Sequence, residues 1–182
     1  MIIGIAGSFG AGKGTVVEYL QSIGFTHFSA SGFITEEILR RKMPVNRDSM
    51  IVVANDLRKD NGPSHIIDSL YKRAQETGEN VVIESLRAVA EVRRIKELGG
   101  VVLGVDASPE LRYQRAFARQ SEKDNVSFEK WSEQERIESN NPDPHKQNIF
   151  AALKESDHTI MNDGTIEELY GKVEEWLQTI GK

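Results

Sequence analysis

The sequence predicts an α/β fold in which a five-stranded parallel sheet is the middle of three layers and helices cover both of its faces. Short apolar runs typical of buried strands alternate with helical segments along the whole chain, as in parallel sheets. A glycine-rich turn that contains a lysine joins the first strand to the first helix. The 38% hydrophobic and 28% charged residues are ordinary for a globular protein, and 182 residues suffice for one domain.

The N-terminal segment has the order strand, glycine-rich loop and helix. The apolar run 2–6 leads into Gly7-x4-Gly12-Lys13, which has the spacing of the P-loop motif. Glycines let successive backbone N–H groups turn toward phosphates, and the helix start adds the positive end of its dipole. Lys13 supplies a mobile positive charge for the β- and γ-phosphates of ATP. The predicted ATP-binding residues of this loop are Gly7, Ser8, Gly10, Ala11, Gly12, Lys13, Gly14 and Thr15.

One position of this loop departs from the motif. A hydroxyl residue normally follows the lysine and ligates magnesium, whereas here Gly14 follows and Thr15 comes one place later. A Mg²⁺ ion is therefore expected to carry more water and fewer direct protein oxygens, with Thr15 acting through water or near the α-phosphate. The alternative is a glycine-rich turn without a ligand, which does not explain why strand, spacing, lysine and helix agree.

Composition argues against several classes of protein. The formal net charge of −5 argues against broad electrostatic binding to nucleic acid or to an anionic membrane. The absence of cysteine excludes disulfides and thiolate sites, and the four histidines lack the close pairing of metal ligands. No apolar run approaches the length of a membrane span and the start lacks the pattern of a secretory signal, so a cytoplasmic protein is expected.

Each element is predicted from its own pattern. The predicted strands are an apolar run at 2–6, buried strands at 81–84 and 101–106, and short strands at 25–29 and 158–161. The predicted helices have apolar residues at helical spacing and occupy 13–23, 31 to before Pro44, 47–61, 64–77, 89–98, a segment from 109, a segment that ends at 151–155, and 165–180.

Caps and helix faces follow from single residues. Ser31 is expected to cap the second helix, and Ser108 to cap the helix that begins at Pro109. Ile166 is expected to face inward with the other apolar residues of the last helix. Residues 120–146 are highly polar with few apolar anchors, so a helical excursion outside the core is expected there.

Two charged residues stand at or just after the end of the third predicted strand. This end lies at the sheet edge where parallel sheets bind ligands. Glu84 ends an apolar run and is predicted to ligate Mg²⁺ directly or through water, as carboxylates do in P-loop proteins. Arg87 stands three residues later and is predicted to hold an acceptor phosphate. The alternatives are a charged strand exit and a surface arginine.

Arginines at two further places are candidates. Arg112, Arg115 and Arg119 share one helix face, where they would repel one another without an anion such as a phosphoryl group in transfer. A solvated basic face is the alternative. Arg40 and Arg58, on the helices after the second strand, are candidates for the acceptor pocket, and exposed helix charges are an equal alternative.

The segment Gly7-Ser-Phe-Gly-Ala-Gly-Lys-Gly-Thr15 resembles the loop of adenylate kinase and of other nucleoside monophosphate kinases. Ser29–Gly32 resembles the start of their acceptor-binding segment, and Val81–Arg87 resembles their magnesium strand with its acceptor arginine. Ile160–Thr165 is similar to the loop that borders adenine in this family and in dephospho-CoA kinases. The likeness is greatest to uncharacterised archaeal-type adenylate-kinase-like proteins and covers nearly the whole chain.

This resemblance implies a single P-loop kinase domain over residues 1–182, with an acceptor-binding helical insertion at about 31–78 and a lid at about 120–146. It implies ATP as the donor, Mg²⁺ as the cofactor and small nucleotides as partners, without nucleic acid or membrane, in a monomer or small homo-oligomer. The implied residues are Lys13, Arg115 and Arg119 for catalysis, Asn162 and Gly164 beside the adenine, Ser31, Gly32, Arg40, Arg58 and Arg87 for the acceptor, and Glu84 and Thr15 for the metal.

The expected activity is transfer of the γ-phosphoryl group of ATP to a nucleoside monophosphate. The chain departs from the family in having Glu84 in place of Asp, Thr35-Glu36-Glu37 where an arginine is usual, and no Asp-x-Asp at 29–31. A hydroxyl acceptor needs a carboxylate base, so the lack of one at 29–32 favours a phosphate acceptor. A dephospho-CoA-type kinase that phosphorylates a hydroxyl, and a non-kinase nucleotide-binding switch or regulatory ATPase, stay open as alternatives. A GTPase is disfavoured because no Asn-Lys-x-Asp stretch occurs.

Overall fold

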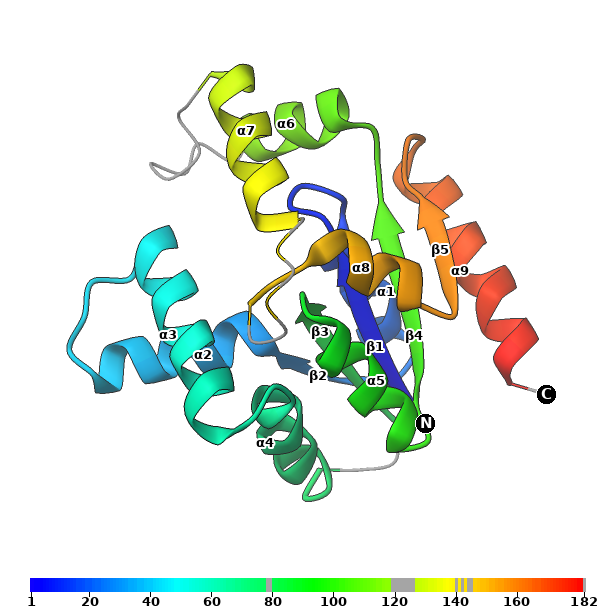
Figure 1. Cartoon of the computed structure of the whole chain (residues 1–182). Coiled ribbons are helices and arrows are strands. Elements are labelled where there is room, and N and C mark those ends of the chain that lie inside the picture. The colour runs from blue at the N-terminus through cyan, green and yellow to red at the C-terminus, as the bar shows by residue number, and fades with distance from the viewer. Residues whose placement is uncertain (78–79, 119–126, 140, 142, 144–145, 182) are drawn as a thin grey trace.

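A parallel sheet is the centre of the molecule. The computed structural model describes residues 1–77, 80–118, 127–139, 141, 143 and 146–181. Within these residues, five parallel strands form one sheet in the order β2-β3-β1-β4-β5. The strands are β1 (Ile2–Gly7), β2 (Thr26–Ser29), β3 (Val81–Leu86), β4 (Val101–Asp106) and β5 (His158–Met161). This arrangement, visible in Figure 1, confirms the predicted fold class.

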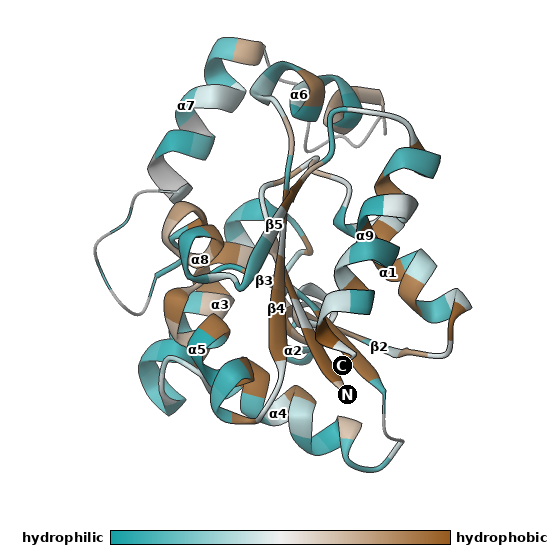
Figure 2. Ribbon diagram, turned by 90° about the vertical axis from the view of Figure 1, so that its right-hand side faces the viewer, coloured by the Kyte–Doolittle hydropathy of each residue, from teal (hydrophilic) through white to brown (hydrophobic). Residues whose placement is uncertain are grey.

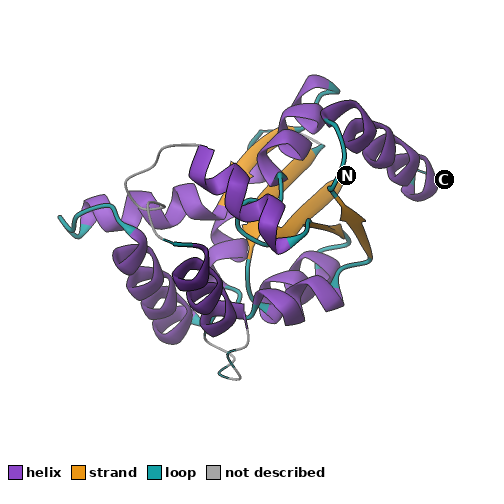
Figure 3. Cartoon of the chain, turned by 90° about the horizontal axis from the view of Figure 1, so that it is seen from above, coloured by secondary structure: helices purple, strands orange, loops and turns teal. Residues whose placement is uncertain are grey.

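The helices cover both faces of the sheet and extend beyond it. Their bounds are α1 (Lys13–Ser22), α2 (Ala30–Arg40), α3 (Arg47–Asn61), α4 (His65–Ala74), α5 (Val89–Glu97), α6 (Pro109–Ala118), α7 (Phe128–Ser139), α8 (Ile149–Glu155) and α9 (Ile166–Ile180). Helices α1 and α9 pack on one face, and α5 and α8 pack on the other. The view from above in Figure 3 shows helices on both sides of the sheet. Helices α6 and α7 stand beyond the carboxyl end of β4, at the top of Figure 1.

Alternate strand residues contribute to two separate hydrophobic cores. In β1, Ile3 and Ile5 pack with α1 and α9, whereas Ala6 packs in the core that α5 and α8 cover. All three side chains are fully buried. The central strands β1, β3 and β4 are covered on both faces and are mostly apolar rather than alternating, whereas the edge strands β2 and β5 contain polar residues. Figure 2 shows β4 as a hydrophobic strand with helices of mixed hydropathy around it.

Two predictions about helix ends and faces are wrong. The N-cap of α2 is Ser29 rather than Ser31, because the Ser29 hydroxyl accepts a hydrogen bond from the Gly32 N–H at 3.0 Å. Helix α2 therefore follows β2 directly, without a linking residue. Ile166 does not face inward: it is 55% exposed, since it is the first residue of α9 and precedes the turn that packs on the sheet.

The third strand is longer than predicted and contains an irregularity. It continues past Glu84 to Leu86. Ile5 pairs with Glu84 but the next residue, Ala6, pairs with Leu86, so Ser85 is an extra residue in β3. Ser85 has a backbone φ of +69°, a conformation that residues other than glycine rarely adopt. Bulges of this kind often redirect side chains next to active sites.

Helix α7 is anchored more firmly than the polar sequence around it suggests. The prediction of few apolar anchors over 120–146 misses Trp131, which is 1% exposed and is among the largest fully buried side chains. Its ring packs edge-on against Tyr113 of α6, with ring centroids 5.8 Å apart. Helix α7 is thereby fixed to α6. Residues 119–126, 140, 142, 144 and 145 lie outside the described residues.

Within the part of the chain that the structure describes, no helix is both long enough and apolar enough to cross a membrane.

Candidate active site

The glycine-rich loop between β1 and α1 has a conformation that requires glycine. Gly7, Gly10 and Gly12 have φ values of +153°, +78° and +97°. A Cβ atom on Gly7 would lie 2.1 Å from the carbonyl oxygen of Val105, and one on Gly10 would lie 2.3 Å from that of Arg112. Both obstacles are backbone atoms, which cannot rotate away. The loop is therefore held closely between β4 and α6, in the kind of glycine conformation that can turn backbone N–H groups toward an anion.

The loop after β5 directly contacts the glycine-rich loop between β1 and α1, which is called the phosphate loop below. The Asn162 side chain donates a hydrogen bond from Nδ2 to the Ala11 carbonyl at 2.9 Å, and it fills the space where a Cβ on Gly12 would lie. Arg115 of α6 in turn donates from Nη1 to the Asn162 carbonyl at 2.8 Å. Three predicted parts of the site are therefore in contact: Asn162 for the adenine, the loop for the phosphates and Arg115 for the transferred group. Gly164 is exposed, two residues farther along.

Lys13 lies folded over the phosphate loop. Its ammonium group donates hydrogen bonds to the carbonyls of Gly7 at 2.9 Å and Ser8 at 2.7 Å. Both partners are neutral carbonyl groups, and the positive charge of Lys13 also acts on Glu84. Gly14 and Thr15 occupy the first turn of the same helix, and a Cβ on Gly14 would meet nothing within 4 Å. The position where the P-loop motif usually has a hydroxyl is therefore open space.

Glu84 lies in a polar cluster at the carboxyl end of β2 and β3. The hydroxyl of Ser29 donates to Oε1 of Glu84, and the hydroxyl of Ser85 donates to Oε2. His27 Nε2 lies 3.8 Å from Oε1, within ion-pair distance. Burial raises the pKa of Glu84, but His27 and the two hydroxyls outweigh burial and lower it to about 2, and the charge of Lys13 acts in the same direction. Glu84 is therefore ionised at neutral pH.

The low pKa of Glu84 predicts a pH-dependent contribution to stability. Because its folded-state pKa lies below its ordinary value of 4.5, the ionised carboxylate stabilises the fold above about pH 4.5. This contribution is lost as the pH falls toward 2. The free energy of unfolding of Glu84→Gln should therefore lie below that of the wild type at pH 7, and the gap should narrow between pH 4.5 and pH 3. Urea midpoints over pH 3–7 measure the gap, and a gap that does not change with pH would contradict this assignment.

The chemistry of these residues suits a Mg²⁺ ion that is carried mainly by the nucleotide. Among the described residues, no group of three or more His, Cys, Asp or Glu side chains could hold a metal by itself. Glu84 offers one ionised carboxylate near Lys13, and Thr15 offers one hydroxyl at the start of α1. This donor set matches an ion bound to phosphate oxygens and water, with few protein ligands.

Arg87 is the predicted acceptor residue that the structure holds next to the end of β3. Its N–H donates to Oε2 of Glu91 at 2.8 Å, and its carbonyl accepts from the Asn148 N–H at 2.8 Å. Its side chain is half-buried, with Nη1 3.4 Å from Oε1 of Gln147. Ser31 lies one strand away, with its hydroxyl 2.9 Å from that of Ser29. These positions bring Arg87 and Ser31 to the same sheet edge as Glu84.

The other predicted acceptor residues have different surroundings. The Arg40 side chain is 74% exposed and makes a double hydrogen bond to Glu37 at 2.6 Å. The Arg58 side chain is only 3% exposed and binds Glu91. Gly32 lies in the first turn of α2, where its N–H is bonded to the Ser29 hydroxyl. Arg40 and Arg58 are therefore engaged by carboxylates rather than presented to an open pocket.

The three arginines of the α6 segment are not equivalent. Arg112 is buried and links α6 to α7: its side chain pairs with Glu135, and its guanidinium lies 5.4 Å from the centre of the Trp131 ring. Arg115 is half-buried beside the phosphate loop. Arg119 lies outside the described residues. The predicted shared anion-binding face thus includes one residue, Arg112, that serves packing.

Sequence reasoning missed several residues of this region. Ser29 and Ser85 contact Glu84, yet serines near strand ends are too common to single out. Glu91 is fully buried and binds the backbone after β3. Only half of a capping-box signal is present here, because Glu91 stands at the third helical position but Ala88 at the N-cap has no hydroxyl. A pocket of about 440 Å³ lies beside α5, between Pro63 and Asn148, and none of the predicted site residues that the structure describes lines it.

The fold and the loop geometry together define a P-loop domain of the kinase-like type. A family model described as an AAA domain matches residues 3–141. The chain belongs to that family. A protein named UPF0200 protein from Thermococcus sibiricus is 28% identical over 188 residues, which cover 100% of this chain and 96% of the relative.

Solved structures share the fold at low sequence identity. A shikimate kinase from Bacteroides thetaiotaomicron aligns with a TM-score of 0.60 and 13% identity, covering 98% of both chains. A dephospho-CoA kinase from Campylobacter jejuni aligns with a TM-score of 0.50 and 18% identity, covering 98% of this chain and 96% of that one. These likenesses confirm a kinase-like fold, in line with the resemblance to nucleotide kinases.

Proposed function

We propose that this protein is an ATP-dependent phosphotransferase that moves the γ-phosphoryl group of ATP to a nucleoside monophosphate. The observation that carries the proposal is the placement of Lys13, Glu84 and Arg87 at one edge of the sheet. Lys13 follows β1, and the other two come from the carboxyl end of the neighbouring strand β3. A donor loop, an ionised carboxylate and an acceptor arginine are the groups that phosphoryl transfer needs, since its catalysis is mainly positioning and charge stabilisation.

The donor side would work as follows. Backbone N–H groups of residues 7–15 hold the phosphates of ATP, and Lys13 moves from its loop carbonyls to the β- and γ-phosphates. Glu84 and Thr15 would hold Mg²⁺ through water, and the ion would neutralise phosphate charge when bound. Asn162 and Gly164 would border the adenine. Arg115, fixed beside the loop, would stabilise the phosphoryl group in transfer.

The acceptor side would use Arg87 as the phosphate clamp, with Ser31 and Gly32 at the start of α2. Arg87 can bind a phosphate through two parallel N–H donors. Residues 31–78 would form the acceptor-binding insertion. Residues 120–146, with Arg119, would close as a lid and exclude water that would otherwise hydrolyse ATP. Arg40 and Arg58 are left out of the direct contacts because Glu37 and Glu91 engage them.

A hydroxyl acceptor is the second candidate, and one observation favours it. Glu84 is ionised and lies among the hydroxyls of Ser29 and Ser85, so a hydroxyl group can approach its carboxylate. The two fold neighbours named above are kinases of shikimate and of dephospho-CoA, whose acceptors carry hydroxyls. The pKa of about 2 makes Glu84 a weak base, however, and a phosphate acceptor needs no base.

An acceptor panel tests the proposal. Purified protein with ATP and Mg²⁺ is given ribo- and deoxynucleoside monophosphates, dephospho-CoA, shikimate or no acceptor, and ADP release is measured with product identification. We expect one nucleoside monophosphate to raise turnover at least tenfold and to appear as the diphosphate. Turnover only with dephospho-CoA or shikimate would support the second candidate. ATP binding without acceptor-stimulated turnover would contradict both.

A further inference from the structure

A buried ion pair joins α3 to the beginning of α5. The side chains of Arg58 and Glu91 are 3% and 0% exposed. Arg58 donates from Nε at 2.9 Å and from Nη2 at 2.8 Å, and both bonds end on the same oxygen, Oε1 of Glu91. The pair spans 33 residues of sequence, so it connects the helical segment after β2 with the segment after β3.

The second oxygen of the same carboxylate holds the backbone that follows β3. Oε2 of Glu91 accepts from the N–H of Arg87 at 2.8 Å and from the N–H of Ala88 at 3.1 Å. The Arg87 carbonyl is fixed independently by the Asn148 N–H at 2.8 Å. Both backbone polar groups of Arg87 are therefore bonded, and one of them is bonded through a carboxylate whose charge Arg58 balances.

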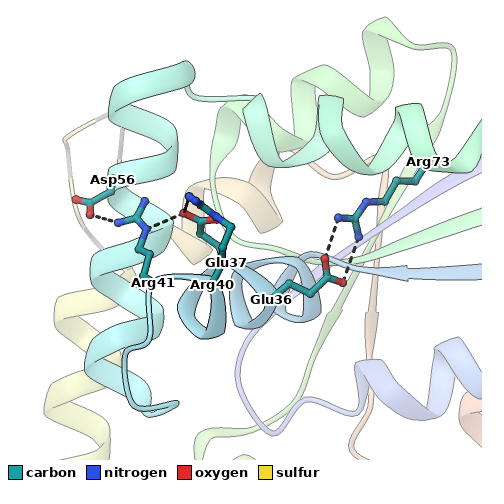
Figure 4. Close-up of polar contacts among 6 residues, drawn as sticks. All are labelled: Glu36, Glu37, Arg40, Arg41, Asp56 and Arg73. Carbon is teal, nitrogen blue, oxygen red and sulfur yellow. Dashed lines mark hydrogen bonds and ion pairs between the residues drawn. The ribbon is translucent and has the colours of Figure 1, made fainter.

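Other arginines of α2–α4 make ion pairs of a different kind. Figure 4 shows Arg41 between Glu37 and Asp56, and Arg73 against Glu36. Arg73 and Glu36 are 47% and 60% exposed. Such an exposed pair contributes little to stability, and the Arg41–Glu37 pair is only partly buried. The Arg58 pair differs from both, because it is fully buried and its carboxylate also binds the backbone of Arg87.

Burial makes the Arg58 charge necessary for the carboxylate. A buried carboxylate that loses its cation is left with an uncompensated charge, and it then moves toward water or takes up a proton. Either response removes or weakens the bonds to the two backbone N–H groups. The orientation of the residue after β3 thus depends on a side chain that does not itself approach the site.

We infer that Arg58 is a positioning residue: through Glu91 it fixes the backbone of Arg87 and so aims the Arg87 guanidinium at the acceptor phosphate. This inference rests on the proposed function for the role of Arg87. It replaces the direct contact expected of Arg58 from the sequence with an indirect one. A positioning residue of this kind affects the KM for the acceptor and leaves the KM for ATP unchanged, because the donor loop is built from other segments.

The experiment compares three variants with the wild type. Arg58→Met removes the cation, and Arg58→Met with Glu91→Leu removes both partners, so no unpaired charge is left buried and the protein folds. Arg93→Met is the matched control, which breaks the exposed pair with Glu155 and lies on the same helix as Glu91. Thermal unfolding, hydrogen exchange of the Arg87 and Ala88 amides by NMR, and the KM values for acceptor and ATP are measured for each.

We expect both Arg58 variants to exchange the Arg87 and Ala88 amides at least tenfold faster and to raise the KM for the acceptor at least tenfold. The KM for ATP should change less than twofold. Arg93→Met should change none of these quantities. A double variant with wild-type exchange, or with faster exchange but a wild-type KM for the acceptor, would overturn the inference.

Arg87→Ala, measured in parallel, separates the inference from the proposed function. The proposed role of Arg87 is wrong if Arg87→Ala leaves the KM for the acceptor unchanged, or if the wild type phosphorylates no acceptor. In either case the part of the inference that concerns the Arg87 guanidinium is wrong as well. The exchange rates still decide whether Arg58 fixes the backbone. If Arg87→Ala raises the acceptor KM and the Arg58 variants do not, only the inference fails.

Discussion

Replacing Lys13 by alanine is expected to abolish phosphoryl transfer, with a loss in kcat/KM of about a thousandfold or more, while the protein stays folded. The loss follows from the position of the ammonium group, which folds over the phosphate loop and binds the carbonyls of Gly7 and Ser8. Removing one preorganised charge-stabilising group typically costs about 10²–10³ in rate. Lys13 also contributes to ATP binding, so the combined loss is larger. A coupled assay for ADP with the preferred acceptor measures it.

The control for this variant is Lys154→Ala, which removes an exposed lysine of α8. Circular dichroism and thermal unfolding of both variants should match the wild type, because the Lys13 ammonium contacts loop carbonyls rather than the core. Turnover above a tenth of the wild-type rate in Lys13→Ala would place the phosphate site elsewhere. Unfolding of the variant would show that Lys13 holds the loop together, contrary to this prediction.

Trp131→Ala is expected to have the largest effect on stability. The ring is 1% exposed and packs against Tyr113, Phe128 and the guanidinium of Arg112. Truncating a fully buried tryptophan typically costs about 3–5 kcal/mol through lost contacts and the cavity that remains. For a chain of this length such a loss lowers Tm by about 10 °C. Differential scanning calorimetry measures the shift.

Phe117→Ala is the matched control, since it removes an aromatic side chain that is 52% exposed on the neighbouring helix α6. It should shift Tm by less than about 2 °C, as surface substitutions generally do. A Trp131→Ala protein with the Tm of the control would mean that α7 does not depend on this contact. A shift confined to a separate, earlier transition would mean that α6 and α7 unfold apart from the sheet.

The central sheet and the phosphate loop could be predicted because their signals are local. Strand β1, the glycines and Lys13 follow one another within fifteen residues, and the central strands β1, β3 and β4 are mostly apolar. Parallel topology then brings the ends of β1 and β3 together without further information. The predictions for Glu84 and Arg87 relied on this rule, and the structure places both at the expected edge.

The surroundings of the site could not be predicted because they depend on long-range packing. Nothing local to Arg58 indicates that its partner is Glu91, 33 residues away, rather than solvent. Trp131 is surrounded in the sequence by polar residues, so no apolar pattern at helical spacing indicates that it is buried. The bulge at Ser85 arises from pairing with β1, which the sequence of β3 by itself does not contain.

The close contact between Gly10 and the Arg112 backbone makes nucleotide binding and helix position thermodynamically linked. At Gly10 the phosphate loop lies so close to the Arg112 backbone that no Cβ atom fits between them. The Arg112 side chain in turn pairs with Glu135 of α7. A ligand that shifts the loop must therefore change the free energy of the α6–α7 pair. Linkage is reciprocal, so if the loop binds ATP as proposed, whatever stabilises the ligand-bound arrangement of α6 and α7 tightens that binding by the same factor. The contact at Gly10 thereby couples ligand binding at the loop to the positions of α6 and α7.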